Sequence, residues 1–451
     1  MATAGGANSH WSSPFAFLMA SVGFAVGLGN IWRFPYVTGE NGGAAFVLIY
    51  LACAFLIGVP ILMAELMIGR RGDGAPPIAM ARVAEESERS RQWKWVGGMG
   101  LLAAYTIEIV YSVVVGWVLW YLFKAVTTGF SGVDAGIAEA QFSAVLGDNA
   151  GMLFWTLIGL AITGYIIFAG VKDGIERAVT IMMPLMFLLL LGLATFNFFA
   201  GGFSEAIAWL FTPDFSKVTF ATVLAAIGQA FFSIGVAMGG MMTYGSYLPR
   251  EISITKSVLI IVCADTVVAL LAGLVIFPAV FTNGLDPAAG AGLIFQTLPV
   301  AFASMPGGHV FAVLFFLMLS VAGITSMVGL IESVNAWIEE HYSISRHASA
   351  VLVVGSIAVL SILSILSYNV LDGLRLGDRN FNAIMDYFSN QILLPLGGLM
   401  IAVFAGWFMQ QRFSREEFTT LGASTYRLWF ALIRYVVPPA LLVIFILGVS
   451  E

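Results

Sequence analysis

The chain of 451 residues is strongly apolar, with 59% hydrophobic and 10% charged residues and a mean hydropathy of +0.93. Soluble domains contain about 25% charged residues, so this composition excludes an ordinary soluble protein and predicts an all-α membrane protein. The net charge of −6 comes without a basic patch, which argues against nucleic-acid binding. The two cysteines, Cys53 and Cys263, lie in apolar stretches and predict no disulfide framework.

Apolar windows separated by polar residues predict eleven membrane spans in a single domain covering residues 1–451. The predicted spans are 13–38, 43–69, 97–125, 151–170, 176–200, 219–248, 254–283, 309–338, 347–367, 382–410 and 426–449. With the N-terminus in the cytoplasm, fourteen lysines and arginines fall in inner loops and four in outer loops. The distribution of positive charge therefore predicts a cytoplasmic N-terminus and, with eleven spans, a C-terminus outside.

The first predicted span contains the stretch GFAVGLGN (23–30), which disfavours a continuous helix because each interior glycine costs about 1 kcal/mol relative to alanine. A second glycine-rich stretch, SIGVAMGG (233–240), interrupts the sixth span. Lipid cannot hydrogen-bond a freed backbone group, so such breaks persist only where they line a buried cavity. Two interrupted spans at matching places indicate the binding site of a secondary transporter. Close helix packing is the alternative explanation for isolated glycines.

The paired breaks predict that residues 13–200 and 219–410 form two inverted halves of five helices each. The helix over 426–449 is then an addition outside the repeat. Between the spans, 76–95 is too polar to cross and is expected along the cytoplasmic surface, and 133–146 can form a short surface helix. The outer connection 284–308 contains a helical piece at 293–303 that acts either as a lid or as a structural cap.

A broken helix offers free amides on one side and free carbonyls on the other. The amides of Leu28 and Gly29 suit a carboxylate, and the carbonyls of Ala25, Phe232 and Ser233 suit an ammonium group. Unwound carbonyls and short hydroxyl or carboxamide side chains also supply the oxygen ligands of Na⁺.

Several ionisable residues fall within the apolar spans. Asp265 is expected to face a cation near Ser233 and Asn30, since a carboxylate at membrane depth is by default functional; a protonated carboxyl bonded to a serine is the alternative. Glu108 and Glu332 are expected to make structural hydrogen bonds. Arg33 and Asp386 can meet to close an outer vestibule, or form a static pair.

Six sequence motifs resemble those of the neurotransmitter:sodium symporter family. They are GLGNIWRFPY (27–36) with ENGG (40–43), YSVVVGW (111–117), GIER (174–177), QAFFS (229–233) and AGITS (322–326). The resemblance implies the leucine-transporter fold, and eleven spans are typical of the short bacterial branch of amino-acid transporters. It also implies a location in the plasma membrane, here a bacterial inner membrane.

The resemblance implies two sodium sites, by position. The first would use Ala25, Asn30, Ser233 and Asp265, completed by the substrate carboxylate. The second would use the carbonyls of Gly23, Val26 and Ala322 with the hydroxyls of Thr325 and Ser326.

The resemblance also assigns roles around the substrate. Tyr111 would bond the substrate carboxylate, and the pocket for the substrate side chain would be lined by Ile107, Gly235, Met238, Ser326 and Leu330. Phe232 would cover the pocket beneath an outer gate of Arg33 and Asp386, while the inner gate would contain Trp11, Tyr247 and Glu340. Gly174 and Pro184 match the element at which helix 5 is thought to unwind.

Three departures from the family pattern bear on function. Chloride-dependent members have Asn and Ser where this chain has Asp265 and Ala269, which predicts transport without chloride and makes proton countertransport possible in principle. Gly27 replaces the aspartate of amine transporters and so favours an amino-acid substrate. The arginine of the inner gate is absent, because Asn8 stands in its place.

Gly235 and Met238 stand where leucine transporters have larger or stiffer side chains, which predicts room for hydrophobic and aromatic L-amino acids. The sequence thus predicts a sodium-coupled symporter of neutral hydrophobic amino acids that works by alternating access and is not an enzyme. The alternatives are a symporter of a small amine or osmolyte, and a channel or substrate sensor that does not couple fluxes. The sequence sets no oligomeric state.

Overall fold

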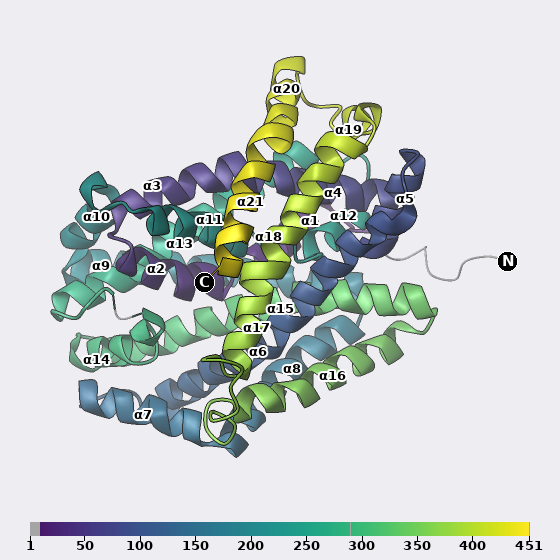
Figure 1. Ribbon diagram of the computed structural model, residues 1–451. Helices are drawn as coiled ribbons and strands as arrows, with labels where there is room; N and C mark the ends of the chain where they lie inside the picture. Colours follow the sequence, from purple (N-terminus) through teal and green to yellow (C-terminus); the bar gives the residue numbers. More distant parts are fainter. Residues whose placement is uncertain (1–9, 289, 451) are drawn as a thin grey trace.

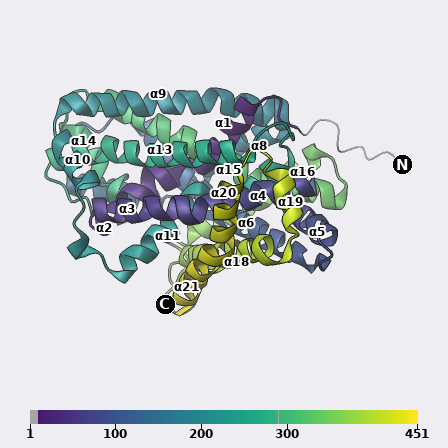
Figure 2. The same cartoon turned by 90° about the horizontal axis from the view of Figure 1, so that it is seen from above.

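The computed structural model describes residues 10–288 and 290–450, which are almost entirely helical (Figure 1). Over these residues, nine continuous helical segments are long and apolar enough to cross a membrane, and one further pair of helices does so with a bend. Figures 1 and 2 agree in placing α5 and α19 at one end of the bundle and α10 and α14 at the other, here called the α5 end and the α14 end.

The continuous spans are built as follows, where η marks a 3-10 or π-helical turn. They are α3 (Ala44–Cys53) with η2 (Ala54–Gly58) and α4 (Val59–Gly72); η3 (Arg91–Trp93) with α6 (Lys94–Thr127); α8 (Asn149–Phe168); η4 (Val171–Glu176) with α9 (Arg177–Ala200); α13 (Ile254–Thr282); α15 (Gly308–Tyr342); α16 (Arg346–Leu366); α17 (Phe381–Tyr387) with η7 (Phe388–Leu393), α18 (Leu394–Val403) and η8 (Phe404–Phe408); and α20 (Ala423–Ala431) with η9 (Leu432–Val436) and α21 (Val437–Ser450).

The first predicted break is present. Helix α1 (Pro14–Ala25) begins where the Ser13 side chain accepts a hydrogen bond from the amide of Ala16, with Pro14 in the first turn. It ends at Val26, whose backbone is extended. The chain resumes as η1 (Gly29–Arg33) and α2 (Phe34–Glu40), bent by 47° from α1.

The second break divides the predicted span 219–248 into two short helices. Helix α11 (Phe220–Ile234) starts at a capping box in which Thr219 and Thr222 bond each other's backbone amides, and it ends at Gly235 with a φ of +71°. Helix α12 (Gly240–Ser246) follows. The nine continuous spans, the bent pair and this interrupted segment account for the eleven predicted spans, so the predicted fold class is confirmed.

The connecting segments are also helical. Helix α5 (Pro76–Glu86) lies in the predicted surface segment and buries one face, and α7 (Ala135–Gly147) matches the predicted short helix. The piece predicted at 293–303 is split into η6 (Gly290–Leu293) and α14 (Thr297–Ser304). The sequence analysis missed α10 (Phe203–Phe211) and the short elements η5 (Phe215–Lys217) and α19 (Gln411–Glu417).

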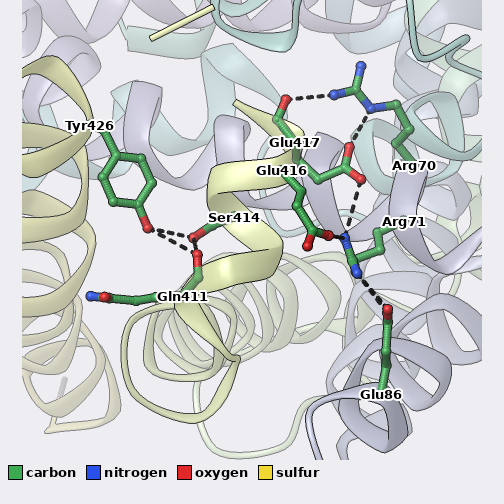
Figure 3. Close-up of polar contacts among 8 residues, drawn as sticks. All are labelled: Arg70, Arg71, Glu86, Gln411, Ser414, Glu416, Glu417 and Tyr426. Carbon is green, nitrogen blue, oxygen red and sulfur yellow. Dashed lines mark hydrogen bonds and ion pairs between the residues drawn. The ribbon is translucent and has the colours of Figure 1, made fainter. Parts of the chain in front are cut away.

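At the α5 end, a cluster of charges joins α4 to α19 and α5 (Figure 3). Nε of Arg70 lies 2.7 Å from Oε2 of Glu417, and the Arg70 guanidinium also donates to the carbonyls of Ile252 and Glu417. Both side chains of this pair are 5% exposed. Arg71 pairs with Glu86 and Glu416 (Figure 3). The end of α4 is thereby tied to α19 and to the segment at Ile252, both distant in sequence, and to the neighbouring helix α5.

Replacing Arg70 by Met is expected to lower the stability of the folded protein by about 3–5 kcal/mol, because the buried Glu417 carboxylate then lacks its partner. The matched control is Arg375→Ala, which removes an exposed pair with Asp372 and is expected to cost about 0–1 kcal/mol. Thermal unfolding of the purified proteins in detergent measures both. Equal unfolding temperatures for the two variants would contradict the role given to Arg70.

Candidate binding site at the two helix breaks

Asp265 of α13 is fully buried between the two breaks and is the centre of a polar cluster. Nδ2 of Asn30 donates to Oδ1 of Asp265 at 2.7 Å and to its carbonyl at 3.0 Å. The Ser233 hydroxyl donates to Oδ2 at 2.7 Å, and the Tyr50 hydroxyl lies 3.3 Å from the same oxygen. The structure thus brings together Asn30, Ser233 and Asp265, which the sequence had placed in one site.

Side chains of this cluster and its neighbours also satisfy the broken backbone. Oδ1 of Asn30 accepts from the amide of Gly27 at 3.2 Å, and Nε2 of Gln229 donates to the carbonyl of Gly29 at 2.8 Å. On the second break, the amide of Ala237 donates to Oε1 of Glu65 at 2.7 Å. The first break is therefore held by its own Asn30 and by Gln229 of α11, and the second by Glu65 of α4, as a freed backbone group in lipid requires.

A second group of oxygens lies where α1 meets α15. The Ser326 hydroxyl donates to the carbonyls of Phe24 at 3.2 Å and Gly23 at 3.4 Å, and the Thr325 hydroxyl donates to that of Ala322 at 3.0 Å. A Cβ on Gly23 would lie 3.3 Å from Cβ of Thr325. Four of the five residues expected at the second sodium site therefore gather here. The fifth, Val26, is buried at the end of α1.

The turn after α1 is packed too tightly for side chains. The amide of Leu28 donates to the Tyr111 hydroxyl at 3.1 Å. A Cβ at Gly27 would lie 2.8 Å from that hydroxyl and would clash with Oγ of Ser326. A Cβ at Gly29 would lie 3.0 Å from Cδ1 of Phe232. The glycines are thus required by the close approach of α6, α11 and α15 to this turn.

A cavity of about 410 Å³ extends from this turn toward the α14 end. Its lining comes from the first break with η1 and α2, from α6, α7 and α11, from η6 and the segment before α14, and from the segment after α16 with α17 and η7. The residues are Leu28, Trp32, Arg33, Tyr36, Thr106, Ile107, Val110, Tyr111, Val114, Trp117, Phe142, Phe232, Gly292, Gln296, Tyr368, Met385, Asp386, Ser389 and Asn390. Four of the expected substrate-binding residues are among them. Ala25, Gly27, Gly29, Ser233, Gly235, Met238, Ser326 and Leu330 are buried and lie outside this lining.

The prediction that Gly235 adds room to the pocket is wrong, because the ring of Phe24 occupies that space. A Cβ on Gly235 would lie 3.0 Å from Cε1 of Phe24, and one on Gly240 would lie 2.5 Å from its Cζ. A Cβ on Gly329 would also clash with this ring. Glycines from the second break and from α15 thus form a slot for Phe24. This role of Phe24 was not predicted, because nothing in the sequence pairs one phenylalanine with glycines more than 200 positions away.

Arg33 and Asp386 both line the cavity, but no ion pair joins them in the described part of the chain. The guanidinium of Arg33 lies over the ring of Phe232, 4.7 Å from the ring centroid. Oδ1 of Asp386 accepts from Nδ2 of Asn390 at 2.7 Å. The expected pairing at the outer gate is therefore not formed in this conformation, since each group has a different partner.

The opposite side of the site is closed by a network at the α5 end. Nε1 of Trp11 donates to the carbonyl of Tyr244, and its amide donates to that of Tyr247, both at 3.1 Å. The Tyr247 hydroxyl donates to Oε1 of Glu332 at 2.8 Å, and Arg346 binds both oxygens of Glu332 at 3.0 and 2.6 Å. The structural hydrogen bonding expected for Glu332 is present, and it includes an ion pair.

The third residue assigned to the inner gate lies elsewhere. Glu340 accepts from the amide of Ala75 at 2.8 Å and pairs with Arg82 at 3.3 Å, so it joins α15 to the start of α5. Arg346, which binds the buried Glu332, was not singled out from the sequence. Asn8 lies outside the described residues.

The two residues expected to unwind helix 5 lie in a wound segment. Gly174 is in η4, where a Cβ would clash with the carbonyl of Ile166, and Pro184 is inside α9. Glu176 at the end of η4 accepts from the amide of Ser12 at 3.0 Å and from its hydroxyl, which ties the span to the start of the chain. The unwinding of helix 5 stays a prediction.

These features define a class: helical membrane transporters in which two broken helices surround a buried polar site. The site is closed at the α5 end and reached by a cavity from the α14 end. More closely, a sequence profile of the Sodium:neurotransmitter symporter family matches residues 8–134 and 141–451, and the chain belongs to that family.

Relatives of known name agree with this assignment. The chain is 34% identical over 443 residues to the sodium-dependent transporter YhdH of Bacillus subtilis, covering 97% of this chain and 96% of that one. It is 24% identical to the sodium- and chloride-dependent GABA transporter ine of Drosophila melanogaster, over 88% of this chain and 46% of that one. Among solved structures, MhsT in complex with L-phenylalanine superposes with a TM-score of 0.91 and 37% identity, covering 98% of this chain and all of that one. The protein is therefore a sodium-dependent symporter and not an enzyme.

Replacing Gly27 by Ala is expected to reduce sodium-driven uptake at least tenfold, because the added methyl group displaces Ser326 or Tyr111. The matched control is Gly228→Ala in α11, where a Cβ meets no neighbouring atom within 4 Å and uptake should be unchanged. Uptake into proteoliposomes measures the effect, with gel filtration to establish that both variants are folded. Normal uptake by the Gly27 variant would refute this tight packing.

Proposed function

We propose that this protein is a sodium-coupled symporter of neutral, mainly hydrophobic L-amino acids, including aromatic ones. The observation that carries the proposal is the buried Asp265–Asn30–Ser233 cluster between the two breaks, beside a cavity that reaches Leu28 and Tyr111. An anionic cluster next to the backbone amides of a broken helix suits a cation and a carboxylate bound together.

The first sodium site is proposed at this cluster, with the Ala25 carbonyl and the side chains of Asn30, Ser233 and Asp265 as ligands. Ion binding there requires Asn30 to present its amide oxygen in place of the nitrogen that now donates to Asp265. The substrate carboxylate completes the coordination. An ion and a substrate that share a ligand raise each other's affinity equally, which is the thermodynamic basis of coupled transport.

The second sodium site is proposed where α1 meets α15. Hydroxyls of Thr325 and Ser326 already lie against the carbonyls of this region. Because these hydroxyls can rotate their protons away, the same oxygens can serve as ligands of Na⁺. The proposed ligands are the carbonyls of Gly23, Val26 and Ala322 and the hydroxyls of Thr325 and Ser326.

The substrate carboxylate is proposed to bind the amides of Leu28 and Gly29 and the Tyr111 hydroxyl, which already contacts the first of these amides. An amine without its own carboxylate would need an acidic side chain near the turn, and Gly27 has no room for one. MhsT, solved with L-phenylalanine, supports an aromatic substrate. The pocket for the substrate side chain includes Ile107, Met238 and Leu330, with Phe24 as an additional wall.

Transport is proposed to be independent of chloride. The Asp265 carboxylate is a fixed negative charge that Ser233 and Tyr50 already hydrogen-bond, so a chloride ion beside it would be repelled. Position 269, one turn along α13, is alanine and supplies no hydroxyl to an anion.

The orientation is proposed from the distribution of positive charge, with the N-terminus in the cytoplasm and the C-terminus outside a bacterial plasma membrane. In that orientation the cavity opens outward and the Trp11–Tyr247 network closes the inside. Alternating access would pair Arg33 with Asp386 above Phe232 and then open the inner network. The halves that move are proposed to be the inverted repeats 13–200 and 219–410, with 426–449 outside them.

The proposal is tested by uptake into proteoliposomes with Na⁺ and Cl⁻ varied independently. Concentrative uptake of phenylalanine, tryptophan, tyrosine and leucine should vanish when choline replaces Na⁺ and persist when gluconate replaces Cl⁻. Competition by betaine or dopamine instead would favour an osmolyte or amine symporter. If the amino acids bind equally tightly in sodium and in choline buffer, the protein is a sensor or channel and the proposal is refuted.

Replacing Asp265 by Asn is expected to make uptake depend on added chloride, because the fixed negative charge is removed while Tyr50, Asn30 and Ser233 remain to hold an anion. In chloride-free buffer the variant should transport at less than about a tenth of its rate in chloride. The matched control is Asp378→Asn, which neutralises an exposed carboxylate and should leave uptake indifferent to chloride. Sodium-driven uptake by the Asp265 variant without chloride would contradict the assignment.

A further inference from the structure

Six acidic side chains are buried within the described residues, and five of them have partners. Asp265 and Glu65 serve the two breaks, Glu176 binds Ser12, and Glu332 and Glu417 pair with arginines. The sixth is Glu108, which is 1% exposed and whose two carboxyl oxygens both lack a hydrogen-bond partner in the structure. The expectation that Glu108 makes structural hydrogen bonds is therefore wrong.

A carboxyl group buried without partners at membrane depth is costly. The hydrogen bonds that it would form to water are lost, and neither lipid nor protein supplies others in their place. An apolar residue of the same size would pack at this position without that cost. An acid kept in such a place is by default a functional residue whose partner has to be identified.

The packing of α6 against α15 defines where Glu108 lies. These helices are antiparallel, because Val115 meets Gly323 while Tyr111, one turn earlier, interacts with Ser326, one turn later. Glu108 is three residues before Tyr111 and seven before Val115, so it lies on the same face of α6. Continuing the register by one turn places it level with Leu330.

This position borders the proposed pocket for the substrate side chain. Ile107, the residue before Glu108, lines the cavity, and Tyr111 one turn away bonds the amide of Leu28. On α15, Leu330 is a proposed pocket residue, and its neighbour Gly329 packs against Phe24. The unpartnered carboxyl thus lies at the depth of the substrate side chain rather than at the sodium cluster.

We propose that Glu108 is a specificity-determining residue that accepts a hydrogen bond from an N–H or O–H group on the side chain of the substrate. Because this inference rests on the proposed function, it narrows the substrate class within hydrophobic amino acids. Tyrosine and tryptophan, which carry such a donor, are preferred to phenylalanine and leucine, which do not.

The preference for tyrosine and tryptophan follows from the free-energy cost of leaving the buried Glu108 carboxyl without a hydrogen-bond donor. An apolar pocket discriminates only weakly between substrates that differ by a hydroxyl group. A pocket with a buried polar group rejects the analogue that leaves this group without a partner. Binding of phenylalanine leaves Glu108 unpartnered, whereas binding of tyrosine supplies the missing donor.

The test compares sodium-driven uptake of L-tyrosine, L-phenylalanine and O-methyl-L-tyrosine by the wild-type protein and by Glu108→Leu and Glu108→Gln. The wild type is expected to prefer tyrosine at least tenfold, by the ratio of kcat/KM, over both analogues. Glu108→Leu should abolish or reverse this preference while transporting phenylalanine at least as well as the wild type. Glu108→Gln, whose amide oxygen still accepts a hydrogen bond, should retain part of the preference.

The matched control is Ser112→Ala, which changes a buried polar residue one turn along α6 whose hydrogen bonds go to Ser361 and Ile109; its tyrosine preference should equal that of the wild type. Equal transport of tyrosine and phenylalanine by the wild type would overturn the inference, and so would a preference that survives in Glu108→Leu. If Glu108→Leu fails to fold, the wild-type comparison of tyrosine with O-methyltyrosine decides alone. Loss of sodium dependence for all three amino acids would instead refute the proposed function.

Discussion

The structure depends on one constraint: a helix that breaks inside lipid must find hydrogen-bond partners within the protein. Here those partners are side chains, of which Asn30 belongs to the broken segment itself and the others are carried by other helices. Asn30 and Gln229 hold the first break, and Glu65 holds the second. The breaks are therefore stabilised by the assembled bundle, and one of the groups that hold them, Asn30, also belongs to the polar cluster around Asp265.

The two ends of the site are held by different kinds of interaction. At the α5 end, the buried Glu332 pairs with the partly exposed Arg346 and accepts a hydrogen bond from Tyr247, whose carbonyl binds the amide of Trp11. At the α14 end, Arg33 lies on the ring of Phe232, and within residues 10–288 and 290–450 it forms no ion pair. The contact at the α14 end is therefore a cation on an aromatic face, whereas the contact at the α5 end is a carboxylate bound on both oxygens by a guanidinium.

The sequence predicted the main site well because its signals are local. Glycine clusters mark the breaks at 23–30 and 233–240, and a lone acid in an apolar span marks Asp265. The remaining errors concern contacts between spans. Phe24 fills the space that the missing side chain of Gly235 seemed to provide, and Glu340 binds Arg82 instead of the Trp11 network. Neither contact has a local signature, because each depends on how helices from distant parts of the chain are rotated against one another.

The sequence by itself determined the membrane class, the eleven hydrophobic segments, the two interruptions and the family, since each of these follows from residue type and spacing along one segment. Only the tertiary structure decided which buried acids have partners. Glu332 and Glu108 looked alike in the sequence, yet one is bound on both oxygens by Arg346 and the other has no hydrogen-bond partner among the residues that the structure describes. The reason is physical: the state of a buried charge depends on the atoms within about 3 Å of it, and in a bundle of long helices those atoms come from other parts of the chain.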